Sequence, residues 1–198
     1  MIARHDLRTL PALAWKNGGG TTREIARRPA GASLDDFDWR VSVATIAADG
    51  AFSAFTGVDR WIVLMRGGGV RLTGAGIDHR LDVPHVAFAF DGATPLHAAL
   101  LDGESADFNV MSRRGRVHAR FSVLRDAARL DIAGAGVVHA ACGTWTLAGD
   151  ARCAGDLVEG EGIGWDGENA IAMRATPRTT TAVLYVVDVV SGNRAGIT

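Results

Sequence analysis

Residues 15–25 bring together many of the side chains in this chain that could do chemistry. They read Trp-Lys-Asn-Gly-Gly-Gly-Thr-Thr-Arg-Glu-Ile, so an indole, an ammonium, an amide, two hydroxyls, a guanidinium and a carboxylate flank three glycines. Glycine loses more backbone freedom on folding than any other residue, and a chain accepts this cost where φ must be positive or where another group approaches the backbone closely. The stretch therefore predicts either a tight turn between two strands or a pocket whose N–H groups and polar side chains hold a small anion.

Polar residues elsewhere in the chain also favour anion recognition. An arginine can hold a carboxylate through two parallel hydrogen bonds. The candidate charge-assisted donors are Lys16, Asn17, Arg40 and Arg60. The candidate apolar walls are Trp15, Trp39, Trp61 and Phe108. For Arg60 the alternative is a surface ion pair with its neighbour Asp59.

The histidine spacing does not predict a metal site. The six histidines are His5, His79, His85, His97, His118 and His139. No two are separated by a single residue, and neither a His-Glu-x-x-His nor a Cys-x-x-Cys motif occurs. Ligands distant in sequence could still converge in space, but we expect no bound metal and no cofactor.

Nucleotide-binding and nucleophile motifs are also incomplete. The dinucleotide pattern that begins at Gly18 and Gly20 fails at its third glycine, where Arg23 stands. The run 67–69 of three glycines is not followed by Gly-Lys-Ser/Thr. No serine lies in a Gly-x-Ser-x-Gly elbow. Glu24 and Asp59 could form an acid/base pair, although two carboxylates in polar loops are usually solvated.

Composition limits the classes of protein. Of 198 residues, 47% are apolar and 22% charged, with a formal net charge of −1, as in an ordinary globular protein. No basic stripe points to nucleic acid, and no apolar run approaches the ~20 residues of a membrane helix. The N-terminus has no apolar signal region, so we expect a cytoplasmic protein. Cys142 and Cys153 are then expected to be thiols, more typical of buried structural cysteines than of a reactive pair.

Residues 39–44 carry the pattern of a half-buried strand. Trp39, Val41 and Val43 alternate with Arg40, Ser42 and Ala44, so Arg40 and Ser42 share one face. On an open sheet this face would meet solvent. In a closed barrel it would face the lumen, where a guanidinium and a hydroxyl can bind a ligand.

The rest of the chain predicts an all-β fold. Short apolar runs alternate with turns about every 8–12 residues, which is typical of a barrel or a sandwich. Only residues 126–130 look helical. A break near Gly115 would divide the chain into two barrels of similar size, residues 1–115 and 116–198, which we expect to share a packed interface because no flexible linker separates them.

Four segments resemble the HutD/Ves family of small bacterial proteins. They are residues 15–25, residues 37–44, residues 49–60 and residues 107–114, the last reading Asp-Phe-Asn-Val-Met-Ser-Arg-Arg. They occur in the family's order and at comparable spacing, and the total length agrees as well. The match spans roughly residues 11–115 and has no supporting motif in the second half.

The resemblance implies a fold and a function. The fold would be all-β, with two double-stranded β-helix (cupin) barrels in tandem, a bicupin. The function would be regulation of histidine utilisation by binding urocanate or a formate-like pathway acid, without established catalysis. Arg60 and Asn17 would grip the carboxylate, Arg40, Ser42 and Thr22 would orient it, and Trp15 and Asn109 would contact its far end, with Lys16 and Glu24 nearby.

Two other readings stay open from the sequence. One is a metal-free isomerase, lyase or hydrolase that acts on a small acid with Glu24 as base. The other is an interaction protein whose pocket is vestigial. The expected partner is a small organic acid rather than nucleic acid or membrane, and a homodimer is left open.

Overall fold

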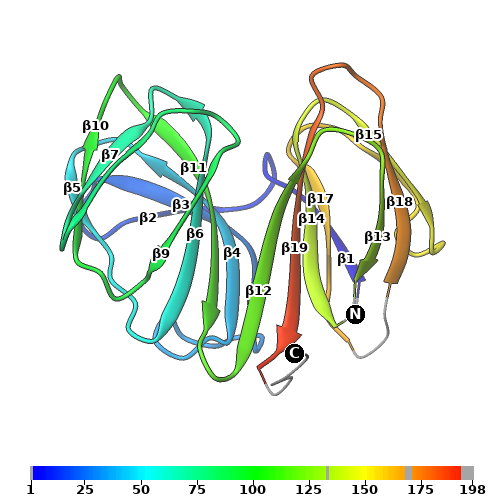
Figure 1. Ribbon diagram of the computed structural model, residues 1–198, viewed down its shortest axis with the longest axis horizontal. Helices are drawn as coiled ribbons and strands as arrows, with labels where there is room; N and C mark the ends of the chain where they lie inside the picture. The colour runs from blue at the N-terminus through cyan, green and yellow to red at the C-terminus, as the bar shows by residue number, and fades with distance from the viewer. Residues whose placement is uncertain (1, 133, 168–170, 193–198) are drawn as a thin grey trace. The chain divides into compact units, whose positions relative to one another are not determined.

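The computed structural model describes residues 2–132, 134–167 and 171–192, and all their regular elements are strands (Figure 1). The all-β prediction is confirmed. Within these residues no helix is long and apolar enough to cross a bilayer. The chain divides into two compact units, one formed by residues 11–114 and the other by residues 1–10 with 115–198. The sequence-based division at residue 115 had placed the first ten residues with the first half.

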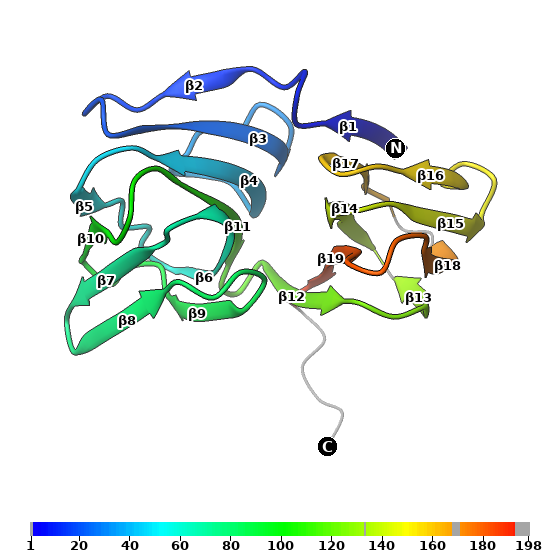
Figure 2. The same cartoon turned by 90° about the horizontal axis from the view of Figure 1, so that it is seen from above.

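The unit of residues 11–114 contains two antiparallel sheets. The six-stranded sheet has the order β2 (Ala12–Ala14), β3 (Gly20–Arg28), β4 (Trp39–Ile46), β11 (Ser105–Arg113), β6 (Val58–Gly67) and β9 (Ala87–Asp91). The four-stranded sheet has the order β5 (Gly50–Phe52), β10 (Leu96–Leu100), β7 (Val70–Gly74) and β8 (Ile77–Leu81). Seen from above, these strands surround a common interior (Figure 2).

One apolar cluster connects the two sheets of this unit. Ile46, Ile62 and Leu64 of the larger sheet pack with Leu72 and Leu96 of the smaller one, and each is nearly or fully buried. Burial of such side chains contributes roughly 1.5–3 kcal/mol each. The apolar cluster fills part of the lumen, and polar side chains occupy another part.

The alternation predicted for residues 39–44 is confirmed in β4. Both faces of the strand are shielded from solvent, since Val41 is 0% and Ser42 2% exposed. Pro11 precedes β2, which is an edge strand of the six-stranded sheet. The backbone N–H that proline lacks is therefore not needed for hydrogen bonds to strands on both sides.

The second unit also contains two antiparallel sheets. The first has the order β1 (Ile2–Asp6), β17 (Glu161–Trp165), β14 (Ala135–Cys142), β19 (Val183–Ser191) and β12 (Val117–Leu124). The second has the order β13 (Ala128–Ile132), β18 (Ile171–Pro177), β15 (Trp145–Gly149) and β16 (Gly155–Leu157). Pairing of β1 with β17 explains why the first ten residues belong to this unit.

The helical prediction for residues 126–130 was wrong. Ala128–Ile132 pairs with β18 along its whole length, and Leu130 packs against the apolar core of this unit. The favourable helix propensity of a short Ala-Ala-Arg-Leu run is only a weak prior, and cross-strand pairing with apolar burial overrides it.

Large apolar side chains form the core of the second unit. Trp145, Trp165 and Ile163 are at most 2% exposed and pack with Cys153, which is fully buried. Both cysteines are free thiols; Cys142 is partly exposed. In this unit a pair of histidines also lies close together, with Nε2 of His5 3.1 Å from Nδ1 of His139.

Candidate functional site

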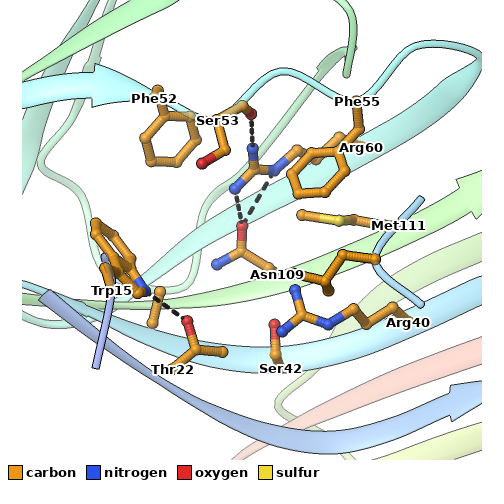
Figure 3. Close-up of a pocket in the computed structure, with 12 residues that line it drawn as sticks. Trp15, Thr22, Arg40, Ser42, Phe52, Ser53, Phe55, Arg60, Asn109 and Met111 are labelled. Carbon is orange, nitrogen blue, oxygen red and sulfur yellow. Dashed lines mark hydrogen bonds between the residues drawn. The ribbon is translucent and has the colours of Figure 1, made fainter. Parts of the chain in front are cut away.

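A cavity of about 140 Å³ lies in the unit of residues 11–114 (Figure 3). It is lined by Trp15, Thr22, Leu34, Arg40, Ser42, Ala44, Phe52, Ser53, Phe55, Arg60, Asn109 and Met111. Residues from β3, β4, β6 and β11 form one wall, and the others come from loops and from the end of β5.

Strand register places the polar side chains of the wall next to one another. Asn109 on β11 pairs with Ser42 on β4, and Met111 pairs with Arg40 on β4 and with Arg60 on β6. Because side chains alternate along a strand, all five point to the same face. The hypothesis that Arg40 and Ser42 face a lumen is therefore confirmed by the fold.

Arg60 is 5% exposed, and three of its five N–H groups are occupied by neutral partners. Nε and Nη2 donate to Oδ1 of Asn109, at 3.2 and 2.6 Å, and Nη1 donates to the Ser53 carbonyl at 3.2 Å (Figure 3). Two N–H groups remain, so the guanidinium can still donate to a ligand.

Aromatic rings cover this guanidinium. Its carbon lies 4.2 Å from the Phe52 ring centroid, 5.5 Å from that of Phe90 and 5.8 Å from that of Phe55. Burial, with the charge of Arg40 adding to it and Asp107 opposing it, lowers the pKa of Arg60 to about 9, which still leaves a cation at neutral pH. No carboxylate forms a salt bridge with Arg60 in the described part of the chain. A desolvated cation without a paired anion favours binding of a negatively charged ligand.

Arg40 differs from Arg60 because it already has an anionic partner. Its Nε donates to Oε2 of Glu24 at 2.9 Å, and the other oxygen of Glu24 forms an ion pair with Nε of Arg27 at 3.2 Å. Arg40 keeps its Nη groups for the cavity, whereas Glu24 is engaged by two guanidinium groups and does not line it.

The glycine triplet forms the turn between β2 and β3 and positions Trp15. Gly18 has φ +71°, and Oδ1 of Asn17 accepts a hydrogen bond from the Gly19 amide at 3.1 Å. A Cβ on Gly20 would lie 2.2 Å from the Thr45 carbonyl and 3.1 Å from the Trp15 ring. The indole packs over this glycine, and its Nε1 donates to Oγ1 of Thr22 at 2.8 Å.

Six of the nine residues predicted for the site line the cavity: Trp15, Thr22, Arg40, Ser42, Arg60 and Asn109. The structure places Lys16, Asn17 and Glu24 outside the cavity lining. The Lys16 side chain is exposed, Asn17 binds the backbone of the glycine turn, and Glu24 is held by two arginines. The prediction that Trp39, Trp61 and Phe108 form apolar walls of the site was wrong. Each lies on the face of its strand that points away from the cavity.

Sequence reasoning missed the apolar part of the lining. Phe52, Phe55, Met111 and Leu34 come from three different places in the chain. The two phenylalanines follow a predicted turn and lack a periodic pattern, so no signal marked them as ligand contacts. Met111 could have been predicted as a lining residue, because it lies two residues from Asn109 on the same strand and therefore on the same face.

Gly20→Ala should destabilise the protein and disturb the cavity. The new methyl group would collide with the Thr45 carbonyl and press on Trp15, and overpacking of this kind typically costs about 1–3 kcal/mol. Urea unfolding should show the loss, with a changed tryptophan emission spectrum. Gly19→Ala is the matched control, because its methyl group would meet only the Asn17 side chain, at 3.5 Å. Equal stability of both variants would contradict this role for Gly20.

The described residues contain no cluster of three or more His, Cys, Asp or Glu side chains suited to hold a metal ion. The expectation of a metal-free protein stays a prediction, which elemental analysis of untagged protein can test.

The family comparison agrees with this architecture. A family model named HutD matches residues 4–183. The chain belongs to the HutD family. Among its relatives, Protein Ves of Citrobacter koseri is 37% identical over 170 residues, 85% of each chain. An uncharacterised 21.2 kDa protein from the hutC 3′ region of Pseudomonas putida is 42% identical over 120 residues, 61% of this chain and 63% of that one.

Solved structures show the same fold. HutD from Pseudomonas fluorescens SBW25, described as a formate condition, has a TM-score of 0.84 at 28% identity and covers 96% of this chain and 99% of that one. A cupin 2 conserved barrel domain protein from Leptotrichia buccalis has a TM-score of 0.61 at 10% identity, covering 95% and 96%. The predicted family and the tandem cupin fold are thus both confirmed.

Proposed function

We propose that the cavity binds a small organic carboxylate, and that this HutD family member senses or limits histidine and urocanate catabolism without turning the ligand over. The observation that carries the proposal is Arg60, a buried guanidinium with two spare N–H groups and no salt bridge among the described residues. Arg40, held by Glu24, adds a second cationic group to the wall.

The shape of the site suits a flat acid. Aromatic rings and Met111 surround the arginine, while Ser42, Thr22 and Asn109 supply neutral polar contacts. A cavity of roughly 150 Å³ in another protein accommodates benzene, so about 140 Å³ has room for a formate or for the acrylate end of urocanate. The imidazole of urocanate would then extend toward Leu34, the lining residue whose side chain is half exposed.

The descriptions of two relatives support the proposal. One is the HutD structure of P. fluorescens in its formate condition, and the other is the P. putida protein named for the hutC region. Glu24 gives little support to the alternative of an enzyme, because Arg40 and Arg27 hold its carboxylate oxygens and it does not line the cavity. An assay for urocanate turnover distinguishes the alternatives.

Saturating urocanate should raise the melting temperature. A ligand that binds only the folded state stabilises it by about 2.7 kcal/mol at a hundred times its Kd, which for a protein of this size corresponds to roughly 5–10 °C. Histidine should give a smaller shift, because its ammonium would approach Arg60 and Arg40. The measurement is differential scanning fluorimetry at pH 6.5 over a wide concentration range. If another class of metabolite gave a shift and urocanate did not, the histidine-pathway assignment would fail.

A further inference from the structure

Asp107 is a fully buried acid next to the cavity wall. It lies on the same face of β11 as Asn109 and Met111, which line the cavity, and it pairs with Ala44 on β4, another lining residue. On the other side it pairs with Leu64 of β6, a member of the apolar cluster. Asp107 therefore occupies the boundary between the polar and the apolar parts of the lumen.

The carboxyl group of Asp107 has no hydrogen-bond partner. Neither oxygen accepts a well-formed hydrogen bond, and the one hydroxyl close enough to act on the carboxylate is that of Ser105, two residues away on the same strand. Buried carboxylates in proteins are almost always paired or hydrogen-bonded, because an isolated buried charge is costly. Whether the Asp107 carboxyl is neutral or ionised therefore depends on the charges that lie near it in the lumen.

The charged groups that face this part of the lumen are few. On the neighbouring strands they are Arg60 of β6 and Arg40 of β4, with Glu24 of β3 bound to Arg40. Burial raises the pKa of Asp107 to about 7, although the Arg60 charge and the Ser105 hydroxyl act in the opposite direction. When it is ionised, above about pH 7, Asp107 therefore adds a negative charge near Arg60 without a direct hydrogen bond to it.

We propose that Asp107 couples carboxylate binding to the uptake of one proton, so that the cavity selects its anionic ligand most strongly when Asp107 is neutral. The inference rests on the proposed function. When a carboxylate binds Arg60, a charged Asp107 would become a second buried anion beside the same guanidinium, and like charges in one site are unfavourable. One proton from solvent then joins the Asp107 carboxylate as the ligand enters, which keeps the net charge of the site unchanged.

The affinity for formate at several pH values tests this coupling. Formate is a suitable probe because its own charge does not change between pH 6 and 8.5. In the native protein the Kd, measured by tryptophan fluorescence, should be nearly constant below pH 7 and should rise about tenfold per pH unit above it, since each such unit costs about 1.4 kcal/mol. In Asp107→Asn, which is neutral at every pH, the Kd should change less than about twofold.

Asp188→Asn is the matched control. Asp188 is also a partly buried acid with a raised pKa, but it lies on β19 of the other compact unit and pairs with Arg120. This variant should follow the pH dependence of the native protein. If Asp107→Asn does not fold, calorimetry of the native protein at pH 7.5 in Tris and in imidazole still counts the protons, because the buffers release different heats.

The outcomes separate the inference from the function on which it rests. Formate binding that is independent of pH in the native protein, equal pH dependence in Asp107→Asn, or equal heats in the two buffers would each overturn the role of Asp107 while leaving carboxylate binding intact. Absence of saturable binding of formate and of urocanate at every pH would overturn the proposed function and the inference together.

Discussion

Arg60→Lys is expected to weaken carboxylate binding by roughly ten- to a hundredfold while the protein remains folded. Lysine keeps the positive charge but loses the planar fork that contacts Asn109 and the Ser53 carbonyl and still presents two N–H groups to the cavity. It also loses the flat surface that stacks on Phe52 at 4.2 Å. A charge-assisted hydrogen bond contributes about 1.5–3 kcal/mol, which corresponds to this change in Kd.

Calorimetric titration with urocanate measures the effect. Arg71→Lys serves as the control, because Arg71 lies on β7 of the same unit but is exposed and pairs with Asp78 outside the cavity. Its affinity should equal that of the native protein. An unchanged Kd in Arg60→Lys would place Arg60 outside the binding site.

Acid should destabilise the protein through the buried histidine pair. Burial lowers the pKa of His5 to about 4 and that of His139 to about 3. Between these values and the ordinary pKa of 6.5, the unfolded chain binds protons that the folded chain does not. The stabilising effect of the neutral pair is therefore fully present above pH 6.5 and is lost as the pH falls. At pH 5 the loss amounts to about 2 kcal/mol for each histidine.

Urea unfolding at pH 7 and pH 5 tests this expectation. Asp107 acts in the opposite direction, because its raised pKa lets the folded chain take up a proton in the same range. The Asp107 contribution is the same in the native protein and in a histidine variant, so it cancels when their free energies of unfolding are compared at each pH. His5→Gln should lose about 2 kcal/mol less than the native protein between pH 7 and pH 5, and His118→Gln, on the exposed side of β12, should lose as much as the native protein. Equal losses in the native protein and His5→Gln would disprove the effect.

The sequence of residues 15–25 predicted the turn correctly but identified only some of the side chains that line the cavity. Three glycines predicted a turn or an anion pocket, and the structure has the turn, with Gly18 at positive φ. Gly20 instead allows Trp15 and the Thr45 carbonyl to approach closely. The residues that flank the glycines have different roles. Trp15 and Thr22 line the cavity, whereas Asn17 accepts a hydrogen bond from the turn itself. Sequence proximity alone could not decide which side chains shared the site.

The alternation in β4 was more informative, because a strand has a fixed period of two residues. It correctly placed Arg40 and Ser42 on one face, and strand closure made that face a lumen. The same rule shows why Trp39, Trp61 and Phe108 cannot be cavity walls: each occupies the face opposite to a lining residue on its own strand.

The sequence by itself determined the all-β class, the HutD family and the arginines of the site, because alternation, turn residues and motif spacing are local properties of the chain. Only the tertiary structure decided that Arg60 lacks a carboxylate partner, that Phe52 stacks on it and that Asp107 is buried beside it without a hydrogen bond. The desolvation and the charge of a group depend on strands that are distant in sequence, and their register is set only when the sheets close around the shared core.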